Sequence, residues 1–131
     1  MYRIFISHSW TYGDQYFRVE DFLKEQLGTF YNHSIPKDDP VHTNGTDRQL
    51  YVKIEDHILG CNCVVILAGV YSTYSKWINK EIEIAKKMGK PIIAVEPWGA
   101  LRTSAVVKDA ADITVGWNSK SIADAVRKFS K

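Results

Sequence analysis

The chain has 131 residues, of which 45% are hydrophobic and 24% charged, a balance that excludes a disordered segment and suits one globular domain. The formal net charge is only +2 and like charges do not gather in long runs, which disfavours broad binding to nucleic acid. The longest nearly apolar run, Cys63–Tyr71, is far shorter than the roughly 20 residues that span a bilayer. We therefore expect a single domain over residues 1–131 that binds neither nucleic acid nor a membrane.

Short apolar runs alternate with segments of helical period, a pattern typical of repeated β–α units with a parallel sheet. Strands are expected at Tyr2–Ile6, Tyr31–Ile35, Cys63–Ala68, Pro91–Val95 and Asp112–Val115. Helices are expected at Tyr16–Leu27, Arg48–Leu59, Trp77–Met88 and Ser121–Phe129. The sequence therefore predicts an α/β fold of the flavodoxin-like type, in which a five-stranded parallel sheet carries helices on both faces.

Local signals mark the ends of the helices. Gly13 begins the first helix, and Gly60 and Gly89 end the second and third as C-terminal glycines do. Ser121 and Asp124 form a capping pattern at the start of the last helix. The first helix is expected to pack through its large apolar residues, which are Phe17, Phe22, Leu23 and Leu27.

The two cysteines, Cys61 and Cys63, stand two residues apart, a spacing at which a strand points both to the same side of a sheet. Because this geometry does not favour a disulfide, we interpret them as reduced packing residues. A zinc site needs two further ligands and His57 is the nearest candidate, so a metal site is disfavoured. The first residues resemble a strand rather than a signal peptide, so we expect the cytoplasm.

In open parallel sheets, ligands bind beyond the carboxyl ends of the strands, near the point where the strand order reverses. The loops expected there are rich in aromatic and hydrogen-bonding side chains, which suit a ligand with flat rings and hydroxyl groups. These side chains are Ser7, His8, Ser9, Trp10, Tyr12, Asp38, Asp39, Tyr71, Ser72, Tyr74, Ser75 and Trp98. Simpler interpretations stay open, because His8 suits an ordinary hydrogen-bonded loop and the aspartates suit a solvated turn.

The helix expected at Trp77–Met88 carries a carboxylate on its apolar side. At about 100° per residue Glu81 falls near the middle of that side, whereas Glu83 falls on the solvent side. Burial of a carboxylate costs free energy and raises its pKa, while a position in about the first helical turn favours the ionised form. Glu81 is therefore an active-site candidate; the alternative is a glutamate that caps backbone amides or pairs with a lysine.

Several familiar chemistries lack their motifs. The glycines form neither the dinucleotide-binding fingerprint Gly-x-Gly-x-x-Gly nor a Walker loop, and no serine stands in a Gly-x-Ser-x-Gly nucleophile elbow. A response-regulator receiver would carry an acidic pair after its first strand and an aspartate at the end of its third. The chain has Ser7-His8 and Gly69-Val70 at these places, so a receiver is disfavoured.

Three segments resemble the TIR (Toll/interleukin-1 receptor) domain family, and more closely the compact bacterial TIR-like branch found in Thoeris antiphage defence. Tyr2–Ser9 (YRIFISHS) is similar to the first-strand box of the family, and Lys37–Pro40 (KDDP) to its acidic loop after the second strand. Ser75–Ala85 (SKWINKEIEIA) matches the more specific pattern Ser-x-x-Trp-x-x-x-Glu-(Leu/Ile)-x-x-Ala. The resemblance implies a TIR-like, three-layer fold.

In enzymatic members of the family, the glutamate four residues after the tryptophan is catalytic, and here it is Glu81. The resemblance implies cleavage of NAD between nicotinamide and ribose, with transfer of ADP-ribose to water, to itself as a cyclic product or to another acceptor. NAD is then a substrate, and no resident cofactor or metal is implied. The substrate-binding residues that we predict are Ser7, His8, Ser9, Trp10, Asp38, Asp39, Tyr71, Ser72, Tyr74 and Trp77.

A lone domain of this kind would act on a separate effector protein through a diffusible nucleotide product, and family members also assemble with themselves. The chain departs from the family at Ile78, where many members have cysteine, and at Val41, where glycine usually follows the loop proline. Two alternatives therefore stay open. One is a non-catalytic TIR-type module that binds a partner or a nucleotide; the other is a nucleoside deoxyribosyltransferase-like enzyme, against which the Trp77/Glu81 match argues.

Overall fold

The computed structural model describes residues 1–7, 13–35, 46–69, 76–97 and 104–130. The strands in this part of the chain are β1 (Arg3–Ile6), β2 (Tyr31–Asn32), β3 (Cys63–Leu67), β4 (Ile92–Val95) and β5 (Ile113–Val115). The helices are α1 (Gly13–Leu27), α2 (Asp47–Leu59), α3 (Lys76–Lys87), α4 (Ala105–Ala110) and α5 (Ser119–Phe129). All neighbouring strands pair in parallel, in the order β2-β1-β3-β4-β5.

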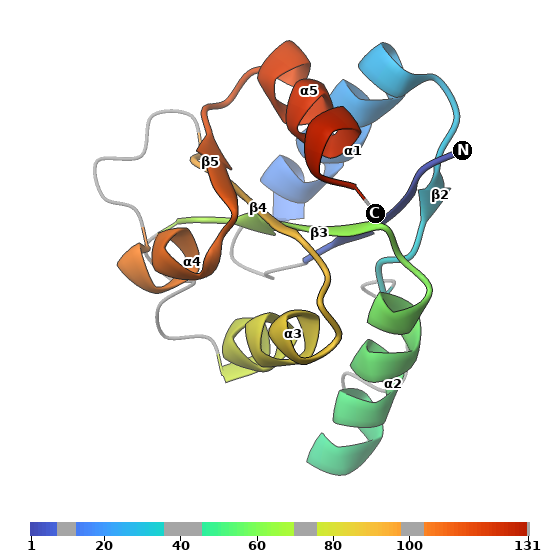
Figure 1. The fold of residues 1–131 in the computed structure, drawn as a ribbon, viewed down its shortest axis with the longest axis vertical. Helices are drawn as coiled ribbons and strands as arrows, with labels where there is room; N and C mark the ends of the chain where they lie inside the picture. Colours follow the sequence, from blue (N-terminus) through green and yellow to red (C-terminus); the bar gives the residue numbers. More distant parts are fainter. Residues whose placement is uncertain (8–12, 36–45, 70–75, 98–103, 131) are drawn as a thin grey trace.

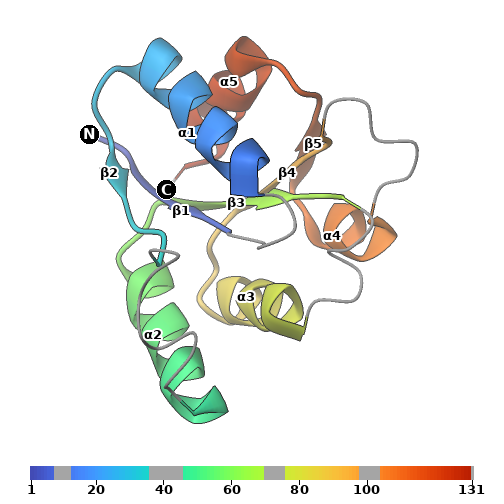
Figure 2. The ribbon, with the colours of Figure 1, turned by 180° about the vertical axis from the view of Figure 1, so that it is seen from behind.

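The sheet is the middle of three layers (Figures 1 and 2): α1 and α5 cover one face, here called the α1/α5 side, while α2, α3 and α4 cover the other, the α2/α3 side. The predicted fold class, a five-stranded parallel sheet with helices on both faces, is thereby confirmed. No helix in the described ranges is both long and apolar enough to cross a membrane.

Alternate strand residues pack on the two sides of the sheet. In β1, Ile4 and Ile6 pack on the α1/α5 side with Leu23 of α1, whereas Phe5 packs on the α2/α3 side with Ile54 of α2. All five residues of β3 are buried, as expected of a central parallel strand covered on both faces. The same alternation directs Ser7, two residues after Phe5, to the α2/α3 side.

The second strand is shorter than predicted, because it ends at Asn32 rather than at Ile35. The Asn32 side chain accepts a hydrogen bond from the Ser34 backbone N–H at 2.9 Å, and this local turn ends the strand. Ser34 Oγ in turn accepts from the Ile6 backbone N–H at 2.9 Å. A side chain therefore takes a place that a backbone carbonyl of a longer β2 would occupy.

The start of the last helix also differs from the prediction. Asn118, rather than Ser121 with Asp124, caps α5: its side chain accepts from the Ser121 backbone N–H at 3.0 Å. Asp124 instead pairs with Lys120 and Arg127 on the exposed face of the helix, and these two cations lower its pKa. The capping prediction was wrong because Asn118, three residues before Ser121, accepts the N-cap hydrogen bond and starts the helix earlier.

Helix α4 was not predicted. It has only six residues, which is too few for the helical period to show in the sequence. Its N-cap is the buried Ser104, whose side chain accepts from the Val107 backbone N–H and whose own N–H donates to Ala68 at the end of β3. The helix is thus fastened to the central strand.

Both glycines predicted to end helices do so, but in different ways. Gly89 has a left-handed φ of 68° after α3, which glycine adopts without steric cost. Gly60 after α2 has a right-handed φ of −83°. Glycine is favoured there because of the close approach of His33, since a Cβ at position 60 would lie 2.9 Å from the His33 ring.

Helix α1 begins at Gly13, as predicted, but its buried row differs in part. Tyr16, Val19 and Leu23 are buried, whereas Phe17 is 52% exposed. The expectation that Phe17 packs inward was therefore wrong. Tyr16, the residue before it, lies on the buried face of α1 with Val19 and Leu23, so Phe17 is turned toward solvent.

The cysteines are both free and buried, which confirms that they are reduced packing residues, but they do not share a side of the sheet. Cys61 packs on the α2/α3 side and Cys63 on the α1/α5 side. The expected alternation begins only at Cys63, where β3 starts. Burial raises the pKa of Cys61 to about 11 and that of Cys63 to about 12, so both thiols stay protonated.

Candidate functional site

The strand order reverses between β1 and β3, the place at which open α/β sheets bind ligands. Ser7 lies at this point, just beyond the carboxyl end of β1. Its backbone N–H donates to Val65 of β3 at 2.8 Å, and the residue is only 1% exposed.

Glu81 is buried in α3, as the helical wheel predicted. It is 6% exposed and lies between Ile78 and Ala85, which are buried in the α2/α3 side of the core. Glu83 points to solvent, with 60% of its side chain exposed, and forms a 3.6 Å ion pair with Lys80. One helix therefore carries two glutamates, two residues apart, in opposite environments.

The position of Glu81 excludes one of the simpler interpretations. Helix α3 begins at Lys76, so Glu81 is its sixth residue and lies in the second turn rather than the first. A side chain at that position is too far along the helix to cap the first free backbone amides. The alternative of a partnering lysine finds no support within the described ranges.

Burial controls the charge of Glu81. Desolvation raises the pKa of its carboxyl from 4.5 to about 8, while the nearby Ser7 hydroxyl favours the ionised form and opposes the change. The expected effect of the helix N-terminus is thus outweighed. Among the described residues, neither Glu81 Oε2 nor Ser7 Oγ has a hydrogen-bond partner of good geometry, although both atoms are buried. Two unsatisfied polar atoms at a strand-order reversal are typical of a site whose ligand supplies the missing bonds.

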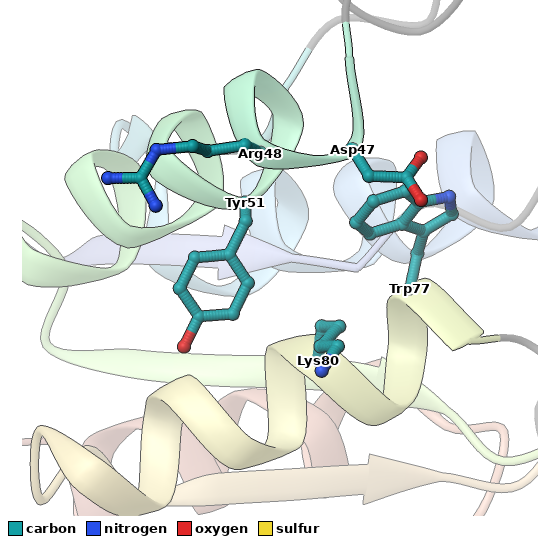
Figure 3. Close-up of a pocket in the computed structure, with 5 residues that line it drawn as sticks. All are labelled: Asp47, Arg48, Tyr51, Trp77 and Lys80. Carbon is teal, nitrogen blue, oxygen red and sulfur yellow. The ribbon is translucent and has the colours of Figure 1, made fainter.

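A second feature lies one helical turn away, between the first turns of α2 and α3. This hollow, the α2/α3 pocket, has a volume of about 280 Å³ and is lined by Asp47, Arg48, Tyr51, Trp77 and Lys80 (Figure 3). Trp77 was predicted as a binding residue, but the other four were not. Their individual positions carry no motif, and only the packing of α2 against α3 brings them together.

The structure thus describes three of the predicted site residues. It brings Ser7 and Glu81 to the α2/α3 side of the sheet and places Trp77 on the neighbouring pocket. The rest lie outside the described residues: His8, Ser9, Trp10, Asp38, Asp39, Tyr71, Ser72 and Tyr74.

His57, the histidine nearest the cysteines in sequence, forms contacts with His33. His57 Nδ1 lies 2.6 Å from the backbone oxygen of His33, and His33 Nδ1 lies 3.3 Å from that of His57. The two rings thus join α2 to the end of β2. Within the described ranges, no three His, Cys, Asp or Glu side chains come together as a metal site.

Comparisons with known proteins agree with this architecture. The model of the family described as Thoeris protein ThsB, TIR-like domain, matches residues 5–102. Among solved structures, the chain is similar to the CMP N-glycosidase BcmB of Clostridium botulinum. The two share 20% identity and a TM-score of 0.57 over 95% of this chain and 98% of that one. At this identity the likeness shows a shared fold alone. A comparison with curated proteins finds no match.

Proposed function

Since this chain belongs to the family of the TIR-like domain of Thoeris protein ThsB, we propose that it cleaves NAD and makes an ADP-ribose-derived signalling nucleotide, cyclic or conjugated, in bacterial antiphage defence. The observation that carries the catalytic part is Glu81, a buried carboxyl group with an unsatisfied oxygen beside the strand-order reversal. The product would diffuse to a separate effector protein, and the enzyme would work in the cytoplasm.

In the proposed reaction, the C–N bond between nicotinamide and ribose breaks. Its electron pair goes to the ring nitrogen, so that nicotinamide leaves as a neutral base and positive charge develops on the ribose carbon. A Glu81 carboxylate placed against that carbon stabilises the charge and can hold the ribose hydroxyls. Water, or a hydroxyl oxygen or ring nitrogen of the same ADP-ribose or of another acceptor, then bonds to the carbon; an O–H nucleophile releases its proton to solvent as the new bond forms.

The raised pKa of Glu81 fits this reaction through substrate binding. With a pKa of about 8, the carboxyl group is mostly protonated at neutral pH in the free protein. The nicotinamide ring of NAD is cationic, and a positive charge nearby lowers the pKa of a carboxyl group. NAD itself thus favours the ionised form that the developing ribose cation requires. The Ser7 hydroxyl, which also favours ionisation, supports the same state.

The test compares the two glutamates of α3. We expect Glu81→Gln to lower nicotinamide release by at least about 100-fold, the usual effect of removing a group that stabilises charge in the transition state. Glu83→Gln, the exposed matched control, should keep the parent rate. Release is measured with the purified protein and in cells challenged with phage, because self-assembly is expected. Equal rates for Glu81→Gln and the parent in challenged cells would reject the catalytic assignment.

A second candidate is cleavage of a nucleoside or nucleotide whose base leaves less readily than nicotinamide. The structural neighbour is named a CMP N-glycosidase, and a glutamate that is protonated at neutral pH can donate a proton to a departing base. Release of cytosine from CMP, or exchange of bases between deoxynucleosides, would favour this candidate over NAD cleavage. Binding without turnover of any of these substrates, in any state, would favour a non-catalytic module.

A further inference from the structure

We infer that the α2/α3 pocket is a nucleotide-binding site, in which Tyr51 and Trp77 contact a flat base and Arg48 and Lys80 hold a phosphate. This inference goes beyond the proposed reaction, because the pocket has its own lining and the lining does not include Glu81. It depends on the packing of α2 against α3 and not on the chemistry at Glu81.

The aromatic contacts come from both helices. Figure 3 shows Tyr51 extending from α2 toward α3, and Trp77 rising from the start of α3 toward α2. Both residues are partly buried against the core, so their rings have limited freedom and keep one surface open to the pocket. Preorganised rings of this kind give stacking surface at little entropic cost, and every nucleobase has a face that can stack.

The charges in the pocket select an anion. Among the described lining residues, Arg48 and Lys80 supply two positive charges and Asp47 supplies one negative charge. In Figure 3 the guanidinium of Arg48 lies on the far side of Tyr51 from Trp77, whereas Asp47 lies on the Trp77 side. In the same view Lys80 lies on the Trp77 side of Tyr51, so Arg48 and Lys80 would contact a phosphate from opposite sides of the Tyr51 ring, while Asp47 can accept hydrogen bonds from ribose hydroxyls or a base amino group.

Lys80 is available to such a phosphate. Its Nζ lies 5.9 Å from the centre of the Tyr51 ring, and its pair with Glu83 is long, at 3.6 Å, and largely exposed. Ion pairs of this kind contribute little, so a phosphate that also meets Arg48 would compete well for the lysine. The base and the phosphate are thus recognised at neighbouring points.

The size of the pocket limits the ligand. A volume of about 280 Å³ is at the lower end of what a small-molecule site offers. It suits a mononucleotide or the nucleotide half of a larger molecule, and not a whole dinucleotide. Trp77 and Glu81 are four residues apart on one face of α3, so their Cβ atoms are about 6 Å apart. The ligand is therefore either the nucleotide half of a substrate held at Glu81 or a separate nucleotide.

Calorimetric titration of the full chain with AMP tests the inference, with adenosine and inorganic phosphate as the two partial ligands. We expect saturable binding of AMP and at least about tenfold weaker binding of either part. The double variant Arg48→Gln/Lys80→Gln should weaken AMP by about tenfold and leave adenosine unchanged, whereas Tyr51→Leu should weaken both. Lys86→Gln, an exposed lysine of α3 outside the pocket, is the matched control and should bind as the parent does.

Three results would overturn the inference: no saturable AMP binding, equal AMP binding by the double variant and the parent, or phosphate binding as tight as AMP. The charge variants change exposed side chains, so they remain informative if Tyr51→Leu unfolds. Repeating the titration on Glu81→Gln separates this site from the proposed reaction, because AMP binding should persist there even if NAD is never cleaved. NAD displacing AMP from that variant would assign the pocket to the substrate, and simultaneous binding would assign it to a separate nucleotide.

Discussion

The two sides of the sheet have similar aliphatic cores but different exceptions. On the α1/α5 side, the described core consists of apolar residues from both helices and alternate strand positions, and its unsatisfied buried atoms, Gln15 Oε1 and Ser130 Oγ, lie at the start of α1 and just after the end of α5. On the α2/α3 side, the same packing is interrupted by Ser7 and Glu81, whose buried Oγ and Oε2 atoms have no hydrogen-bond partner among the described residues, and it is bordered by the α2/α3 pocket. Both sides therefore hold the fold together, but the α2/α3 side also buries a carboxyl group at the ligand-binding edge, which costs stability.

The largest effect on stability is expected at Glu81, the buried carboxyl group of the α2/α3 side. The folded pKa of Glu81, about 8, is above its ordinary value of 4.5, so the folded state retains a proton that the unfolded chain loses. Wild-type stability should therefore fall, relative to Glu81→Gln, as the pH rises from about 4.5 to 8, and then level off. At about 1.4 kcal/mol per pKa unit, the full difference is on the order of several kcal/mol.

Urea denaturation of both proteins at intervals between pH 4 and 9 measures this effect. Glu83→Gln, a substitution of the exposed glutamate on the same helix, provides the baseline. A constant gap between Glu81→Gln and wild type at all pH values would mean that the pKa of Glu81 is the same in the folded and unfolded states. The burial argument for the site would then be wrong.

On the α1/α5 side, a core truncation should cost stability without altering the chemistry. Leu23→Ala removes a fully buried side chain of α1 and is expected to lower the free energy of unfolding by about 3 kcal/mol. Phe17→Ala on the same helix removes a half-exposed ring and should cost well under 1 kcal/mol. Urea denaturation compares the two, and similar losses would contradict the buried row assigned to α1.

A smaller effect is expected at Gly60, where α2 ends beside His33. In Gly60→Ala the new Cβ would meet the His33 ring at 2.9 Å, and that ring is held by its contact with the His57 backbone. We expect a loss of about 1–2 kcal/mol in the free energy of unfolding. Gly116→Ala is the control, since its Cβ would meet no atom within 4 Å. Equal melting temperatures for the two variants would show that His33 moves aside freely.

The smallest predicted effect concerns the cap of α5. Asn118→Ala removes the side-chain acceptor for the Ser121 backbone N–H and should cost about 1 kcal/mol. Ser121→Ala keeps that N–H and should change the free energy of unfolding by less than about 0.5 kcal/mol. A larger loss from Ser121→Ala than from Asn118→Ala in thermal melts would restore the sequence-based assignment of the cap.

The sequence predicted those features that depend on hydrophobic period. The buried run in β3, the apolar stripe of α3 and the inward position of Glu81 all follow from the spacing of apolar residues, and the structure confirms them. Where side-chain hydrogen bonds decide the structure, prediction was poorer. Asn32 shortens β2 and Asn118 moves the start of α5, because an asparagine side chain competes with regular backbone pairing at either place.

The candidate site was predictable only in part, for a related reason. Glu81 could be identified from the sequence because it is an acidic residue on the apolar face of a single helix. Tyr51 and Lys80 give no such signal, because tyrosine and lysine are common at the surface of a helix. Their role in the pocket depends on the packing of α2 against α3, which brings the two side chains together. Interfaces between helices far apart in sequence have no periodic signature.

The main chain at Ser7 is held to β3 by the hydrogen bond from its backbone N–H to Val65, whereas only its side-chain hydroxyl faces Glu81. Any amino acid except proline can donate that N–H, so the main chain here stays tied to the central strand whatever side chain it carries. Related proteins can therefore exchange the hydroxyl for another group and acquire a new reactivity at an unmoved point. The side chain at position 7 can therefore change at the ligand-binding edge without loss of this main-chain hydrogen bond.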